Sequence, residues 1–142
     1  MRIVLDTNVV VSALIWGGTP FQLLQAATNG DIDLCTSPAL LQELRTVLAR
    51  PHLASRLADQ RSSIEQAIGF YGDLTISVSP LATPRIVPRD ATDDHVIAAA
   101  LGAGADLIVS GDADLLSLGS FEAIPIVTPS QAIAQIYAPN GP

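Results

Sequence analysis

The sequence contains no lysine, only one cysteine and no long apolar run. Because Cys35 is alone, an intramolecular disulfide and a cysteine-based zinc site are both excluded. The longest apolar run, residues 9–16, is interrupted by Ser12 and is far shorter than the ~20 residues that span a bilayer. The start of the chain also lacks the charged and apolar regions of a signal peptide. We therefore expect a cytoplasmic protein without a membrane segment.

The net charge of −7 is the next constraint, because a protein that binds phosphate groups usually carries a basic surface. Of the fourteen acids, six lie in the segments discussed below, and the other eight nearly balance the seven arginines. These six are Asp6, Glu43, Asp93, Asp94, Asp112 and Asp114. If divalent cations neutralise them, the remaining surface is close to neutral, and a nucleic-acid partner is compatible with the composition.

Strand-like and helix-like segments alternate along the chain. Residues 2–6 form a β-branched and leucine-rich run without polar alternation, which is typical of a strand buried on both faces of a parallel sheet. We expect further strands at residues 33–36, 75–78, 106–110 and 123–127. Helices are expected at residues 8–16, 20–30, 38–50, 62–71 and 93–103 and from Pro129 onward, with a loop at residues 79–92.

Several of these helices have marked starts. Thr19-Pro20, Ser37-Pro38 and Thr128-Pro129 each combine a hydroxyl N-cap with proline at the first helical position, and Ser62 with Glu65 forms a capping-box pattern. The alternation with short connections predicts a three-layer α/β/α fold around a central parallel sheet of about four to five strands. We expect one domain over residues 1–137 and a short C-terminal tail over residues 138–142.

The acids fall where an open α/β sheet places its ligands, outside the carboxyl ends of the strands. Asp6 closes the first expected strand, and Asp112 follows another strand by a Ser-Gly turn, so both side chains can reach the same crevice. Asp93 and Asp94 stand at the start of a helix. Glu43 lies in the helix after the second strand, beside its apolar face.

Gathering four carboxylates requires a counter-charge. Two carboxylates ~5 Å apart repel by ~3 kcal/mol at an effective dielectric constant near 20. With oxygen ligands and neither a cysteine nor a histidine cluster, the natural cation is Mg²⁺ or Mn²⁺, which retains waters and binds phosphate oxygens. The acids therefore point to phosphate chemistry, although each has an ordinary alternative when taken alone. Asp6 suits a turn or a helix cap, one of Asp93 and Asp94 is more typical of a cap, and Asp114 is more typical of a turn.

Four segments, in this order and spacing, resemble the PIN domain, and within it the VapC-like toxins of bacterial toxin-antitoxin pairs. They are Ile3-Val-Leu-Asp-Thr-Asn8, Ser37-Pro-Ala-Leu-Leu-Gln-Glu-Leu44 with Arg50-Pro51, Asp93-Asp-His-Val-Ile-Ala-Ala-Ala100, and Leu107-Ile-Val-Ser-Gly-Asp-Ala-Asp-Leu115. The resemblance covers almost the whole chain and implies a PIN-like three-layer fold.

Residue by residue, the resemblance implies that four acids bind the metal and carry the catalysis: Asp6, Glu43, Asp94 and Asp112. Three residues would assist them: Asn8, Asp93 and Asp114. Asp94 is preferred over Asp93 because the acid is expected directly before the helix segment that starts at His95. Many relatives have alanine in place of His95, so the choice between the two acids stays open. His95 and His52 have no partner at ligand spacing, and we expect them on the surface or in packing.

The resemblance implies a ribonuclease that uses one or two Mg²⁺ or Mn²⁺ ions. The ions would polarise the scissile phosphate and activate a water for in-line attack, giving a 5′-phosphate product. The expected substrate is single-stranded or looped RNA. Further expectations are the role of toxin in a toxin-antitoxin pair, a cognate antitoxin that covers the site, and a homodimer or higher homo-oligomer.

Two other functions are compatible with parts of the pattern. An aspartate-based phosphatase or receiver-like domain would use a strand-end aspartate such as Asp6, but both types normally rely on a lysine, which this chain lacks. The phosphatase type would also need a second aspartate where Asn8 stands. A non-catalytic PIN-like binding scaffold is the other alternative. Such scaffolds usually lose one or more acids, whereas all four positions are acidic here.

Overall fold

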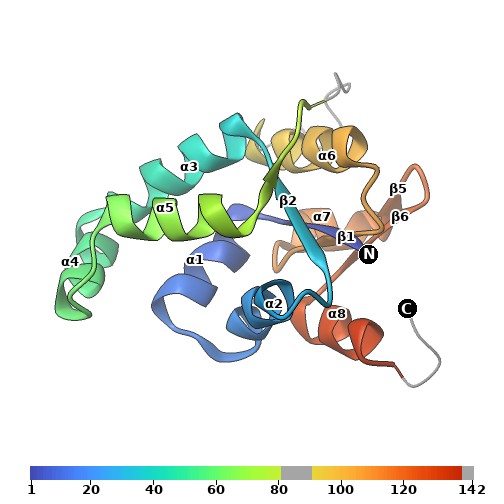
Figure 1. Cartoon of the computed structure of the whole chain (residues 1–142). Coiled ribbons are helices and arrows are strands. Elements are labelled where there is room, and N and C mark those ends of the chain that lie inside the picture. The colour runs from blue at the N-terminus through green and yellow to red at the C-terminus, as the bar shows by residue number, and fades with distance from the viewer. Residues whose placement is uncertain (81–90, 139–142) are drawn as a thin grey trace.

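The computed structural model describes residues 1–80 and 91–138, and of residues 91–93 it describes the backbone alone. Within these residues a central sheet is flanked by helices (Figure 1). The strands are β1 (Arg2–Leu5), β2 (Asp33–Thr36), β3 (Ile76–Ser77), β4 (Leu107–Val109), β5 (Ser120–Phe121) and β6 (Ile124–Val127). The helices are α1 (Thr7–Ile15), α2 (Gly18–Thr28), α3 (Pro38–Leu48), α4 (Pro51–Asp59), α5 (Ile64–Leu74), α6 (Ala91–Ala103), α7 (Ala113–Leu118) and α8 (Pro129–Ile136).

The sheet has the strand order β3-β2-β1-β4-β6-β5. All of its pairings are parallel except that of β5 with β6, which is antiparallel. The expected parallel α/β sheet is thus confirmed, but the described residues form six strands, where about four to five were expected. The addition is β5, only two residues long.

Alternate residues of β1 face opposite layers of helices. Ile3 and Leu5 belong to one buried cluster, which includes Leu23 and Leu24 of α2. Val4 belongs to a second cluster, which includes Ile97 of α6. Burial on both faces explains why β1 has no polar alternation. Helices on both faces make the three-layer arrangement that the sequence predicts, with β1 at the centre of the sheet.

Two of the four marked helix starts differ from those observed. The N-cap of α5 is Ser63, whose hydroxyl accepts from the Gln66 N–H at 3.1 Å, so the expected capping box at Ser62 is wrong. The Ser62 N–H instead donates to the Leu57 carbonyl at 2.8 Å, which closes the end of α4. Helix α2 begins at Gly18, with Gly17 as its N-cap residue, so Thr19 lies inside the helix instead of capping it.

Two helices, α4 and α7, were not predicted from the sequence. Pro51 was expected to end a helix, and it does follow α3, but it also occupies the first turn of α4. Proline suits that position because the first N–H groups of a helix have no intrahelical partner. The second is α7, in a segment where turn residues were expected. The predicted caps at Ser37 and Thr128 are confirmed, and Thr128 forms a complete capping box with Gln131.

Helices α1 and α2 pack on one face of the sheet, and α8 lies beside α2 (Figure 1). No helix in residues 1–80 and 91–138 is, by itself, long and apolar enough to cross a membrane. The pair α1 and α2 passes that test only jointly and by length and composition, and the two helices are bent by 93° at their junction. Of the expected tail, residues 138–142, only Ala138 lies within the described residues.

Candidate active site

Asp6 stands where β1 meets α1. Its backbone N–H donates to the Val109 carbonyl of β4 at 3.0 Å, which extends the strand pairing by one residue. Its side chain is the N-cap of α1, because Oδ1 accepts from the Val9 N–H at 3.0 Å. The residue is only 4% exposed. The helix-cap role considered for Asp6 is therefore real, and it fixes the carboxylate at the carboxyl end of the central strand.

A single hydroxyl links Asp6 to the acid after β4. The fully buried Ser110 donates from Oγ to the second oxygen of Asp6 and accepts from the backbone N–H of Asp112 at 2.9 Å. The sequence predicted that both acids follow the carboxyl ends of strands, and the structure shows that these strands, β1 and β4, are neighbours. It treated Ser110 only as part of the intervening turn, so the bridge that joins the two acids was missed.

Burial dominates the protonation of Asp6. The low-dielectric surroundings disfavour the carboxylate and raise its pKa, and the nearby charge of Asp112 acts in the same direction. Hydrogen bonds from Ser110 and from the backbone N–H groups of Val9 and Asn8 favour the carboxylate but do not offset the burial. A positive charge beside this carboxylate would stabilise its ionised form.

Asp112 and Asp114 flank the start of α7. Asp112 is half-buried and caps the helix, with Oδ1 accepting from the Asp114 N–H at 3.4 Å. Asp114 is half-buried in the first turn, where its charge suits the positive end of the helix dipole. Asp112 therefore has a structural partner on the helix side and the Ser110 bridge on the sheet side.

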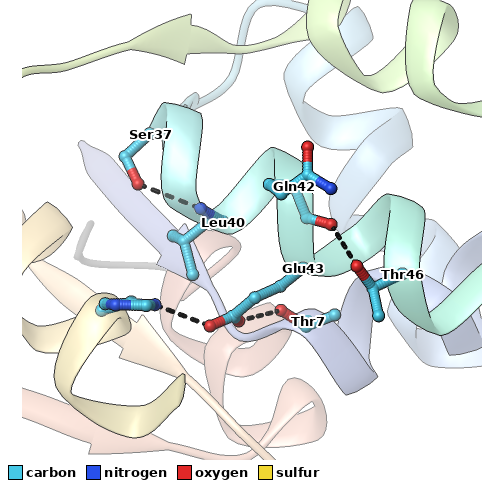
Figure 2. A network of polar contacts seen from close by, with 7 residues as sticks. Thr7, Ser37, Leu40, Gln42, Glu43 and Thr46 are labelled. Atoms are coloured by element: carbon cyan, nitrogen blue, oxygen red, sulfur yellow. Dashed lines mark hydrogen bonds and ion pairs between the residues drawn. The ribbon is translucent and has the colours of Figure 1, made fainter. Parts of the chain in front are cut away.

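Glu43 projects from α3 toward two other elements, as Figure 2 shows for its contact with Thr7. The Thr7 hydroxyl donates to Oε2 at 3.1 Å. The Nδ1 atom of His95 on α6 lies 2.7 Å from Oε1, and this contact becomes an ion pair when the imidazole is protonated. The Glu43 side chain is 19% exposed and that of His95 is 46% exposed. Glu43 thus connects the residue after Asp6 to the residue after Asp94.

His95 lies on the surface, as expected, but its contact with Glu43 was not predicted. His95 is exposed, but it binds a candidate catalytic acid, whereas His52 is simply exposed on α4. Thr7 was also missed. The only available signal was position, because Thr7 and His95 each directly follow an acid of the matching segments.

For two of the remaining predicted residues, Asp94 and Asn8, the structure gives burial or a place in a cleft. Asp94 is half-buried in α6, and the side chain of Asp93 lies outside the described part of the chain. Asn8 is exposed at the start of α1 and lines a cleft of about 420 Å³ together with Asp112. Among the described side chains, no group of three or more acids, histidines or cysteines has the geometry to hold a metal ion.

The donor set nevertheless fits a hard divalent cation. The candidate ligands are carboxylates only, and each carboxylate oxygen that accepts a hydrogen bond retains a further lone pair. Asp6 and Asp112 are joined through Ser110, and Glu43 is joined through Thr7 and His95 to the neighbours of Asp6 and Asp94.

Comparison with known proteins identifies the family of the chain. Residues 2–114 match the family model described as "PIN domain", and this range contains all four acids. The chain is also 32% identical over 119 residues to an uncharacterised protein of Methanocaldococcus jannaschii, MJ1680, and the match covers 83% of this chain and 75% of that protein. PIN domains are typically nucleases and generally use divalent metal ions. Since a family model matches most of its length, the chain belongs to the PIN domain family.

Proposed function

We propose that this chain is a metal-dependent endoribonuclease that hydrolyses phosphodiester bonds in single-stranded or looped RNA. The observation that carries the proposal is the state of Asp6. Its carboxylate is buried at the end of the central strand, its pKa is raised by that burial, and Asp112 is coupled to it through Ser110. Two acids held in this way are stabilised by a cation, and Mg²⁺ or Mn²⁺ suits an all-carboxylate site that also receives a phosphate.

The proposed ligands are Asp6, Glu43, Asp94 and Asp112, with Asn8, Asp93 and Asp114 as supporting residues. A bound Mg²⁺ or Mn²⁺ supplies a Lewis acid for the scissile phosphate and lowers the pKa of a bound water. Ser110 holds the Asp6 carboxylate beside the Asp112 backbone, and Thr7 keeps Glu43 near the end of β1. Carboxylates that are already held in place need to reorient less during the reaction, which lowers its energetic cost.

The substrate class follows from access and from charge. The acids are half-buried or buried at the edge of the sheet, so the scissile phosphate must reach into a recess, which favours unstacked RNA over a duplex. The net charge of −7 disfavours extended contact with a polyanion. A short single-stranded substrate, bound mainly at the cation site, is compatible with both constraints.

The biological role that we propose is that of the toxin in a toxin-antitoxin pair. The support is the resemblance of the acid-containing segments to VapC-like toxins. In this role a small antitoxin protein would cover the site, and the chain would form a homodimer or a higher homo-oligomer. Arrest of growth on expression, relieved by the protein encoded beside it, would support the role, and unaffected growth would count against it.

The nuclease is tested with a pool of single-stranded RNAs and the purified protein in Mg²⁺ or Mn²⁺, with an EDTA control. A double variant, Asp6→Asn with Asp112→Asn, is compared with a matched double variant, Asp59→Asn with Asp73→Asn. The matched variant makes the same charge change at exposed positions on α4 and α5. Metal-dependent cleavage in the wild type and the matched variant, lost in the site variant, is expected. Equal inertness of folded wild type and site variant toward RNA and single-stranded DNA would favour the non-catalytic scaffold instead.

A further inference from the structure

We infer that the cleft beside Asp112 is a subsite for the base of a nucleotide adjacent to the scissile phosphate, with Ser12 and Asn8 as its specificity-determining residues. This inference rests on the proposed nuclease function. The cleft measures about 420 Å³, which lies within the range of about 300–1,000 Å³ for sites that bind small molecules.

The cleft is continuous with the candidate active site. Asp112 lines it, and so does Asn8, two residues after Asp6. Ser12 follows Asn8 by four residues on α1, so both side chains lie on one face of the helix, one turn apart. A nucleotide whose phosphate is at the acids therefore has its neighbouring group within reach of Asn8 and Ser12.

The charge of the lining determines which part of a nucleotide suits it. Among the residues that line the cleft, Asp112 alone carries a charge, and none is basic. Apart from the cation that Asp112 would bind, a second phosphate in the cleft would meet no positive partner. A base or a ribose is uncharged and needs no such partner, so the cleft suits the uncharged part of the substrate.

The remaining lining residues favour the base over the ribose. Pro20 of α2 and Pro129 of α8 offer ring surfaces, and Val9 adds an apolar contact. Apolar surface of this kind suits the flat face of a base, which binding removes from water. Neither the Ser12 hydroxyl nor the Asn8 side-chain amide has a hydrogen-bond partner among the described residues. Both can therefore donate to and accept from the edge of a base.

The test is to sequence the ends produced from a randomised single-stranded RNA. Wild type is expected to prefer certain bases at one position beside the cut. Ser12→Ala removes one hydrogen-bonding group and is expected to weaken that preference about two- to tenfold. Ser55→Ala is the matched control, because Ser55 is exposed on α4 and does not line the cleft. It should leave the preference unchanged.

A second variant narrows the cleft without removing a polar group. Ala113 is exposed, lines the cleft and starts α7, where leucine is compatible with a helix. Because it narrows the cleft, Ala113→Leu is expected to shift the preference toward the smaller pyrimidine bases. The same comparison is made by binding, using Kd ratios for short RNAs of different sequence on an Asp6→Asn background that does not cleave.

The outcomes separate this inference from the nuclease function. A base preference that changes in Ser12→Ala or Ala113→Leu, but not in Ser55→Ala, supports the subsite. Cleavage without any base preference, or with the same preference in both cleft variants, overturns the subsite and leaves the nuclease intact. If folded wild type neither cleaves nor binds RNA, the nuclease proposal falls, and the subsite falls with it.

Discussion

The two halves of the candidate site are held in place by different kinds of structure. In the half that belongs to the sheet, Asp6 and Asp112 follow neighbouring parallel strands. In the half that belongs to the helices, Glu43 projects from α3 and Asp94 from α6. The sheet half is fixed largely by backbone, whereas Glu43 is fixed by two side-chain contacts across different elements.

This difference has an energetic side. Fixing Asp6 in a buried place costs stability, because burial disfavours its ionised form and raises its pKa. Glu43 keeps partial access to solvent, so its carboxylate stays partly hydrated. The sheet half therefore supplies a carboxylate held in a buried place, and the helix half supplies a partly hydrated carboxylate held by two side chains. Removing the buried charge of Asp6 is expected to raise stability while abolishing activity. Removing a contact of Glu43 is expected to lower activity with little change in stability.

The largest effect is expected for Asp6→Asn. Asparagine is as good an N-cap as aspartate, so the cap of α1 can persist while the buried charge is removed. Cleavage should fall by more than about a hundredfold, since loss of a ligand should exceed the 10–100-fold typical of outer partners. In EDTA the free energy of unfolding of the variant should be roughly 0.5–2 kcal/mol higher than that of the wild type, so the variant should be more stable. A less stable variant would contradict the view that burying the Asp6 charge costs stability.

The pH dependence sharpens the same prediction. Since the pKa of Asp6 is raised on folding, its contribution to stability is fully present below the unfolded pKa and is lost as pH rises through the folded pKa. Thermal unfolding in EDTA between about pH 4 and about pH 8 should show this loss in the wild type. The loss attributable to this residue should be absent from Asp6→Asn.

Ser110→Ala is expected to have the next largest effect. It removes the hydroxyl that donates to Asp6 and accepts from the Asp112 N–H, and it leaves both groups without that partner. An unsatisfied buried group costs about 1–3 kcal/mol, so the free energy of unfolding should fall by about that amount. Cleavage should fall roughly 10–100-fold. Ser55→Ala serves as the control, and equal behaviour of the two variants in cleavage and in urea unfolding would argue against the bridge.

The fold was predicted from the sequence wherever a segment carried its own signal. Residues 33–36 were predicted with the observed bounds, because a short buried run beside a marked helix start has no competing interpretation. Strand β5 was missed because two residues are too few to show a pattern. Helix α4 was missed because Pro51 ends one helix and begins the next, and the stop signal was taken alone.

The candidate site was predictable in its acids but not in its connections. Asp6 and Asp112 follow from strand ends, and family resemblance supplied Glu43 and Asp94. The bridge through Ser110 spans 104 residues, and the contact of His95 with Glu43 spans 52 residues. Such contacts depend on which strands pair and how closely α3 approaches α6. No local pattern in the sequence encodes that distance.

In the helix half, His95→Ala is expected to lower cleavage about three- to tenfold, with little change in stability. One of the two contacts of Glu43 is lost, and a single hydrogen bond contributes about 0.5–1.5 kcal/mol. His95→Gln, which can still donate to Glu43, should recover part of the rate. His52→Ala removes an exposed histidine from α4 and is the matched control. A rate in His95→Ala equal to that of the control would show that Glu43 does not depend on this contact.

The smallest single effect is expected for Thr7→Val, which keeps the shape of the side chain but removes the hydroxyl that donates to Glu43. Cleavage should fall only about two- to fivefold, because His95 still holds the other carboxylate oxygen. Combined with His95→Ala, however, the loss should exceed the product of the two single losses, since Glu43 then has neither contact. Mn²⁺ affinity, measured by calorimetry, should show the same non-additivity without reference to cleavage. Strict additivity in both measurements would mean that Thr7 and His95 act independently, and that the helix half is not organised around Glu43.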